Sequence, residues 1–246
     1  VACSDTINTR FYNVYIDKKL DDTVRFQTDV FVGNNMMTTT SKGNFDIDNH
    51  RLIIGGDFYL YKGCKFVHTK GASLHFTSSE AEQSISNSNT ENTYPTMHFT
   101  GSAVKALKTN EFDINGDVII DHDAIVTSSC KLWVSGDWKN AGTFNHSSEV
   151  IFDRNDDDEG GGNQYISSSA FSSVTFAGTG KKMLTGMINV SSQLKIDSLS
   201  TLEVSPDGGT TCYEIKVGGT WKNNVWGPGG PDHGSTGKFI PHKGTV

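Results

Sequence analysis

The stretch "VSGDWKNAGTF", from Val134 to Phe144, joins a strand-like start to a Gly-Asp pair, a tryptophan and a turn-forming end. Two relatives of it stand elsewhere in the chain, "LIIGGDFYL" at 52–60 and "IKVGGTWKNN" at 215–224. Their aligned glycines are Gly56, Gly136 and Gly219, spaced about 80 residues apart. A catalytic site is not expected to recur in this way, so the pattern indicates an internal repeat.

Each copy predicts a strand with one buried face. Apolar residues stand four and two positions before the glycine, and an aromatic residue two positions after it: Leu52, Ile54 and Phe58; Leu132, Val134 and Trp138; Ile215, Val217 and Trp221. The residue after the glycine is Asp57, Asp137 or Thr220. We expect the glycine to adopt positive φ in a turn, the aspartate to accept hydrogen bonds from nearby backbone amides, and the aromatic side chain to fill the core.

Other parts of the period also repeat. The pairs are "FVHTKGASLHF" (66–76) with "FNHSSEVIF" (144–152), "EQSIS" (82–86) with "NQYIS" (163–167), and "YPTMHF" (94–99) with "FSSVTF" (171–176). A third copy of the Gln-x-Ile-Ser signature would fall beyond Val246. The sequence therefore predicts one continuous domain over 1–246, built of units at about 6–86, 87–167 and 168–246, the third incomplete.

The strands inside a unit are short and are separated by Gly, Ser, Asp or Pro, and no 12-residue window keeps a helical stripe. This predicts an all-β protein. A right-handed parallel β-helix with about 20 residues per coil is favoured, because the units run together without a linker and are rich in Ser, Thr and Asn. At about 4.8 Å per coil the rod would be roughly 50–60 Å long. The alternative is a row of Ig-like β-sandwiches.

Composition narrows the classes of partner. The formal charge of the 246 residues is -7, and no block of Lys and Arg occurs, which argues against nucleic acid as a partner. The sequence has no run of 18 apolar residues, so we expect no membrane span. No signal peptide is recognised at its start, and we therefore expect a mature product or a fragment. Cys3, Cys64, Cys130 and Cys212 allow two disulfides or buried free thiols.

The pattern L-x-V-x-G-D-W-x-N-x-G-T-F, followed by Q-x-I-S and V-T-F, resembles repeats of large secreted surface proteins of Bacteroidota. These include gliding-motility adhesins of the SprB type and other type IX secretion cargo. "KLWVSGDWKNAGTFNHSSEVIFD" is the closest match, and the resemblance covers nearly all of the chain. It implies an extracellular β-solenoid at the cell surface that extends or presents something, with no catalytic residues. The partners implied are neighbouring repeats of a longer chain, other surface subunits, or glycans.

Three short patterns are similar to the Asp-Ser/Thr-apolar acceptor for O-glycosylation in that phylum. They are "DTI", "DTV" and "DSL", which place the acceptor hydroxyls at Thr6, Thr23 and Ser198. Modification there would agree with a surface location.

Calcium is the one cofactor that the sequence suggests. The run "RNDDDEGGG" offers the oxygen ligands Asp156, Asp157, Asp158 and Glu159, and "DINGD" alternates Asp113, Asn115 and Asp117. An unbroken acidic run is more typical of a solvated loop, and the second stretch also fits a strand that ends in a turn. The repeated histidines His68, His146 and His242 lie too far apart along the predicted rod to share a metal ion.

The insertion "WGPGGPDHGSTGKF" predicts a loop that projects from the solenoid, where Trp226 and His233 are candidates to stack on a sugar. The competing function is a carbohydrate-active β-helix enzyme, a polysaccharide lyase or hydrolase, for which Asp121, His122 and Asp123 are the dense candidates. No matched base stands in a recognisable motif. We therefore expect a stiff spacer with loops for glycan or partner contact, and no enzyme.

Overall fold

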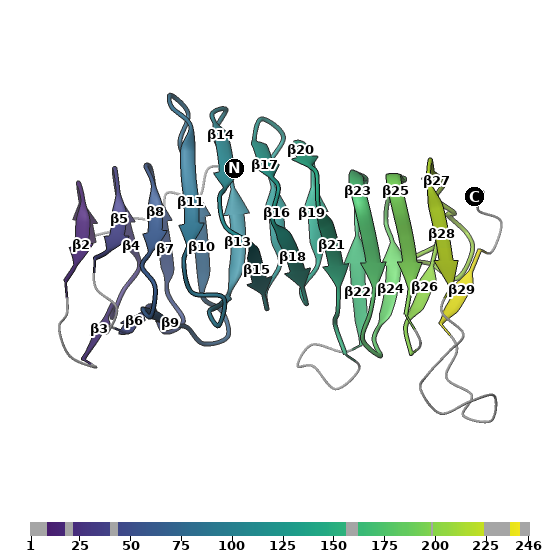
Figure 1. Ribbon diagram of the computed structural model, residues 1–246, viewed down its shortest axis with the longest axis horizontal. Coiled ribbons are helices and arrows are strands. Elements are labelled where there is room, and N and C mark those ends of the chain that lie inside the picture. The colour runs from purple at the N-terminus through teal and green to yellow at the C-terminus, as the bar shows by residue number, and fades with distance from the viewer. Residues whose placement is uncertain are drawn as a thin grey trace.

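A computed structural model describes residues 9–17, 22–39, 44–155, 162–197, 199–223 and 237–241. This part of the chain holds 29 strands and no helix, so it contains no helix that could cross a membrane. Each strand pairs in parallel with strands one coil away, and strands of successive coils lie side by side along one axis (Figure 1). The predicted all-β solenoid is confirmed, and the arrangement is consistent with a right-handed parallel β-helix.

The strands fall into four sheets. The 11-stranded sheet contains β1 (Thr9–Phe11), β4 (Val30–Val32), β7 (Arg51–Ile54), β10 (Ser73–Phe76), β13 (Thr96–Phe99), β16 (Val118–Ile120), β19 (Trp138–Asn140), β22 (Asn163–Ile166), β24 (Lys181–Leu184), β26 (Thr201–Glu203) and β29 (Lys238–Ile240). The 7-stranded sheet contains β2 (Val14–Ile16), β5 (Met36–Thr38), β8 (Phe58–Leu60), β11 (Gln83–Asn87), β14 (Val104–Leu107), β17 (Ile125–Ser128) and β20 (Thr143–His146).

The third side of the coil is shared by two sheets. The 3-stranded sheet contains β3 (Thr23–Arg25), β6 (Asn44–Asp46) and β9 (Lys65–Val67). The 8-stranded sheet contains β12 (Thr93–Tyr94), β15 (Glu111–Ile114), β18 (Lys131–Val134), β21 (Glu149–Phe152), β23 (Ser169–Phe176), β25 (Ile188–Ile196) and β27 (Ile215–Val217), and β28 (Thr220–Asn223) also pairs with β25.

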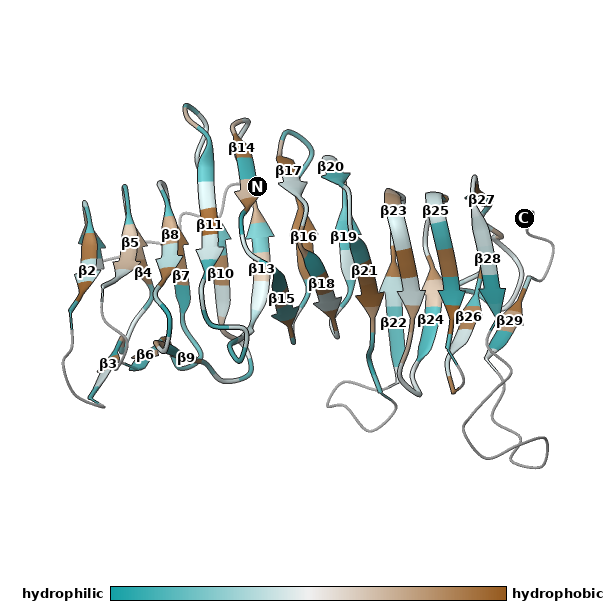
Figure 2. Ribbon diagram, in the orientation of Figure 1, coloured by the Kyte–Doolittle hydropathy of each residue, from teal (hydrophilic) through white to brown (hydrophobic). Residues whose placement is uncertain are grey.

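The core is a set of inward-facing rows that run along the axis. Along the 11-stranded sheet Val30, Leu52, Leu74, Met97, Val118 and Trp138 stack in register, each at most 2% exposed. Brown and teal segments alternate along many strands in Figure 2, as expected where one face of a strand is buried and the other is solvated. Ten spacings of about 4.8 Å make the 11-stranded sheet roughly 48 Å long, close to the length predicted for the rod.

The sequence repeat of about 80 residues does not return to the same side of the solenoid. Gly56 lies between β7 and β8, Gly136 between β18 and β19, and Gly219 between β27 and β28. The three segments repeat in sequence, but they do not occupy one place in the sheets. One unit spans less than four coils of 20 to 23 residues, so each copy begins at a different corner. The local contacts of the unit are nevertheless repeated in its first two copies.

Candidate functional site

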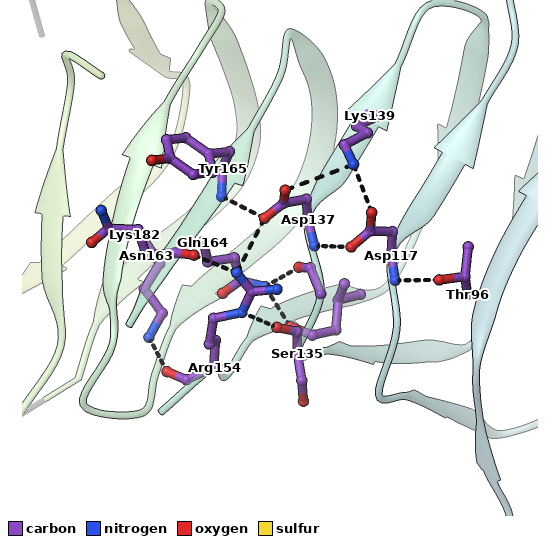
Figure 3. Close-up of polar contacts among 12 residues, drawn as sticks. Thr96, Asp117, Ser135, Asp137, Lys139, Arg154, Asn163, Gln164, Tyr165 and Lys182 are labelled. Atoms are coloured by element: carbon purple, nitrogen blue, oxygen red, sulfur yellow. Dashed lines mark hydrogen bonds and ion pairs between the residues drawn. The ribbon is translucent and has the colours of Figure 1, made fainter. Parts of the chain in front are cut away.

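The aspartates of the Gly-Asp-aromatic motif bind backbone amides of the following coil. Asp57 Oδ1 accepts from the Ser84 amide at 2.8 Å, and Asp137 Oδ1 accepts from the Tyr165 amide at 3.0 Å. Asp117 does the same for the Asp137 amide at 2.8 Å, and Lys139 lies 2.6 Å from its other oxygen (Figure 3). These aspartates accept hydrogen bonds from backbone amides as predicted, but the amides belong to the following coil and not to the same turn.

The predicted reason for the glycines is wrong, because Gly56, Gly136 and Gly219 do not have positive φ. They are required by close approach instead. A Cβ on Gly136 would lie 2.1 Å from the Gly116 carbonyl carbon, and one on Gly219 would lie 1.9 Å from the Ser192 oxygen. The backbones of successive coils are simply too near for a side chain.

The aromatic residues of the motif fill the core in the first two copies. Phe58 is 0% exposed and Trp138 is 1% exposed, as predicted. Trp138 packs against Phe144 at 4.8 Å between ring centroids. In the third copy Trp221 is only partly buried and packs on Phe239 at 5.1 Å, while Thr220 is exposed.

Two fully buried polar residues follow each of the first two copies of the motif, and sequence reasoning missed what they bind. One coil after the first motif, Gln83 Nε2 donates to the carbonyls of Ile54, at 2.9 Å, and Gly56. Gln164 Nε2 donates to Val134 and Gly136, both at 2.6 Å. Each side chain is 0% exposed, so it supplies the donors that carbonyls in a sharp turn would otherwise lack.

A lysine occupies the equivalent place in the coil after each glutamine. Lys105 Nζ donates to the carbonyls of Ser78 and Ala103, each at 2.8 Å, and of Gly101. Lys182 Nζ donates to Arg154 at 2.8 Å, Gly180 at 2.7 Å and Gly178 at 3.4 Å. Here the glycines Gly101 and Gly178 do have positive φ. The signal in the sequence was the likeness of "GSAVKAL" to "GTGKKML".

The ladder of parallel strands breaks once in each of the first two units. We refer to the break between β9 and the Asn87–Tyr94 segment as the first seam. Here the Phe66 amide donates to Asn92 Oδ1 at 2.9 Å, and Asn92 Nδ2 donates to the Cys64 carbonyl at 2.9 Å. Asn92 is 4% exposed, so one buried side-chain amide takes the place of the missing strand pairing.

The second seam is the break between β20 and the Ser169–Phe171 part of β23. Strand β23 pairs with β21 only through its second part, Ser173–Phe176. Its first part, Ser169–Phe171, pairs only with β25. Strand β20 is the last of its sheet, and no strand in the described ranges pairs with its free edge. A groove of about 790 Å³ crosses the outside of several coils here, and residues of both edges line it together with residues of β14, β17, β25 and β27.

His146 lies under this groove and its side chain is held in one orientation. Its ring stacks on Phe144 at 5.2 Å, and Nε2 lies 2.9 Å from the Cys130 carbonyl, to which it must donate. Burial lowers the pKa of His146, which favours the neutral ring. The buried Nδ1 is then an acceptor, and it has no hydrogen-bond partner within the described part of the chain.

The calcium candidates that the structure describes do not form a cage. Both oxygens of Asp117 are engaged, by the Asp137 amide and Lys139. Asp113 lies on the outer face of β15, where burial and the charges of Asp153 and Glu111 raise its pKa. Asn115 lies in the turn that follows β15. Over the described ranges no group of three or more His, Cys, Asp or Glu side chains is placed to hold a metal ion.

Of the acidic candidates for catalysis, Asp121 joins a cluster of histidines on the outer face of the 11-stranded sheet, and Asp123 lies apart from it. Asp121 lies 2.9 Å from His98 Nε2, the His98 ring lies 4.9 Å from that of His75, and His75 Nε2 lies 2.9 Å from Ser73 Oγ. Asp123 lies 2.9 Å from His122 Nδ1, and both side chains are largely exposed. Asp121 and Asp123 therefore bind different histidines.

Several predicted site residues lie outside the described residues: Trp226, His233, Asp156, Asp157, Asp158, Glu159, Thr6, Ser198, Cys3 and His242. Thr23 is described and exposed, so its hydroxyl is accessible. Cys64, Cys130 and Cys212 are free thiols, and burial raises the pKa of the first two.

Comparison with known proteins identifies no relative: no family model, no curated protein and no solved structure matches the chain. A function must therefore be inferred from the fold and from the contacts of the described side chains.

Proposed function

We propose that this chain is an extracellular segment of a bacterial surface adhesin or filament, a stiff spacer that presents loops for glycan or partner contact. The observation that carries the proposal is the buried Gln–Lys pair that recurs in two units. Gln83 with Lys105, and Gln164 with Lys182, bind carbonyls across successive coils, so side-chain hydrogen bonds tie neighbouring turns together. A rod held in this way suits mechanical load.

Pulling single molecules along the solenoid axis tests the spacer. The expected trace shows high rupture forces and stepwise release of coils, because the load is shared by parallel ladders and buried side-chain bonds. A chain that extends smoothly like a flexible linker, with no rupture steps, would contradict the spacer.

A separate test is needed for the surface location. The same test bears on the resemblance to gliding-motility or type IX secretion cargo. Antibody labelling and protease shaving of intact producing cells should detect the chain outside.

The second candidate is a carbohydrate-active enzyme, and the His98–Asp121 contact favours it. A carboxylate that orients a histidine is a recurring arrangement in acid–base catalysis. Chain shortening in a panel of acidic and neutral polysaccharides, absent in Asp121→Asn, would support an enzyme. No shortening of any polysaccharide would leave the spacer as the better account.

A further inference from the structure

The coil junction at the first seam is held by paired strands on only two of its three sides. The coil of β7 to β9 pairs with the next coil through β7–β10 and β8–β11, whereas β9 and β12 do not pair. On this third side Asn92 binds the backbone of β9, and His68 Nε2 lies 3.3 Å from Thr93 Oγ1. Because a coil contacts mainly its neighbours, a change at one junction can open the rod there without unfolding the rest.

One histidine of this junction, His75 on β10, lies between two other basic groups. It stands in register with His98 of β13, with the two rings 4.9 Å apart, and the charge of Arg51 on β7 acts on it from the other side. Two carboxylates also act on His75, but Asp29 is bound to Arg51 at 2.7 Å and Asp121 to His98 at 2.9 Å. A proton on His75 therefore adds a cation to a row of basic side chains on three successive coils.

The other histidine, His68, lies on the unpaired side of the junction. Its ring packs on Phe66 at 5.7 Å between centroids, and Asp46, whose charge acts on it, accepts a hydrogen bond from Arg25 at 2.6 Å. Burial lowers the pKa of His68 and also that of His75, so both rings are neutral at pH 7. When the junction opens, water reaches both rings and they bind protons more readily, so acid favours the open form.

We propose that the first seam is an acid-sensitive joint, where protonation of His68 and His75 separates the coil of β10 to β12 from the coil of β7 to β9. At neutral pH both rings are uncharged, and Asn92 together with the His68–Thr93 contact closes the unpaired side. In acid the two rings become cations in poorly solvated surroundings, and the joint opens while the rest of the rod keeps its strand pairing. The joint follows from the fold and holds whether the chain is a spacer or an enzyme.

The second seam provides the internal comparison. Its histidine, His146, binds the Cys130 carbonyl at 2.9 Å and so faces the preceding coil, not the break. The rings of Phe144 and Phe171 meet across that break, with their centroids 6.1 Å apart. Acid should therefore leave the pairing of β19 with β22, beside the second seam, unchanged.

The test is amide hydrogen exchange of the whole chain between pH 7 and about pH 4.5, expressed as protection factors. The Phe66 and Thr77 amides, which donate across the junction to Asn92 and to the Ile54 carbonyl, should lose about tenfold protection or more. The Ser167 amide, which donates to the Trp138 carbonyl beside the second seam, should change by less than about threefold. In the same samples, NMR of the ring protons of His68 and His75 follows their protonation, whose midpoint should coincide with that of the lost protection.

Two variants separate the joint from a general sensitivity to acid. His75→Gln keeps a polar side chain that cannot become a cation, and it should remove most of the loss of protection at the first seam. His122→Gln, the matched control, replaces a largely exposed histidine and should leave the loss unchanged. A uniform loss of protection along the rod, full protection of the first seam in acid, or an undiminished loss in His75→Gln would each overturn the proposal. If His75→Gln does not fold, the wild-type midpoints decide, and a clear difference between ring protonation and lost protection overturns it.

Discussion

The two seams arise from the same sequence pattern and end differently. In both, a Phe-x-His strand is followed on another side of the coil by a buried glutamine, and then by an aromatic residue that packs in the core. The first copy has room for Asn87, Asn89 and Asn92, and Asn92 binds the exposed edge. The shorter second copy has no counterpart of these asparagines, and the rings of Phe144 and Phe171 meet across the break with their centroids 6.1 Å apart. A difference of four residues thus decides whether a side-chain amide binds the edge of the ladder.

The largest effect is expected from Asn92→Leu at the first seam. The Phe66 amide and the Cys64 carbonyl would stay buried without partners, which should lower the free energy of unfolding by about 2–4 kcal/mol. Chemical denaturation measures the change. Asn145→Ala at the second seam, where the asparagine is exposed, is the matched control and should change stability by less than about 0.5 kcal/mol. Similar losses in both variants would remove the distinction between the seams.

Substitution of the buried glutamine should lower the free energy of unfolding by a similar amount in both copies. Gln83→Leu and Gln164→Leu each leave two carbonyls without a donor, so each should cost about 1–3 kcal/mol. Denaturation curves of the two variants, recorded side by side, provide the comparison. A loss confined to one variant would show that the repeated contacts are not equivalent in energy.

Stability should fall when the pH drops from 6.5 to about 4. Burial, followed by the charges of His98 and Arg51, lowers the pKa of His75 from 6.5 to about 4. The unfolded chain therefore binds a proton in this interval that the folded chain does not, and acid favours unfolding. His68 and His146, one at each seam, contribute in the same direction because burial lowers the pKa of both. Melting temperatures recorded across this range should depend less on pH in His75→Gln, and a slope unchanged by the substitution would contradict this origin.

A smaller effect is expected from Asp137→Asn. The amide oxygen can still accept from Tyr165, but the ion pairs with Arg154 and Lys139, at 3.3 and 3.7 Å, are lost. The expected loss is about 0.5–1 kcal/mol and should shrink in high salt. Thermal unfolding at low and high ionic strength measures both quantities.

The sequence predicted the class of fold because apolar alternation and the repeat are local signals. It also predicted that Asp57 and Asp137 bind backbone amides. It did not predict Gln83, Lys105 and their second copies, because a buried lysine looks like a surface residue until the carbonyls around it are known. Nor did it predict which sides of the coil the units occupy, since that depends on the length of every turn. The second seam was hidden for the same reason.

Amide hydrogen exchange of the free protein tests the central claim most directly. Phe66 and Phe144 occupy corresponding positions, but Asn92 binds only the first of them. The account predicts that the Phe66 amide is strongly protected, that the Phe144 and His146 amides exchange at least tenfold faster, and that the Asn145 amide, on the side of β17, stays protected. Equal protection of Phe66 and Phe144 would show that the second seam is closed as well, and would contradict the account.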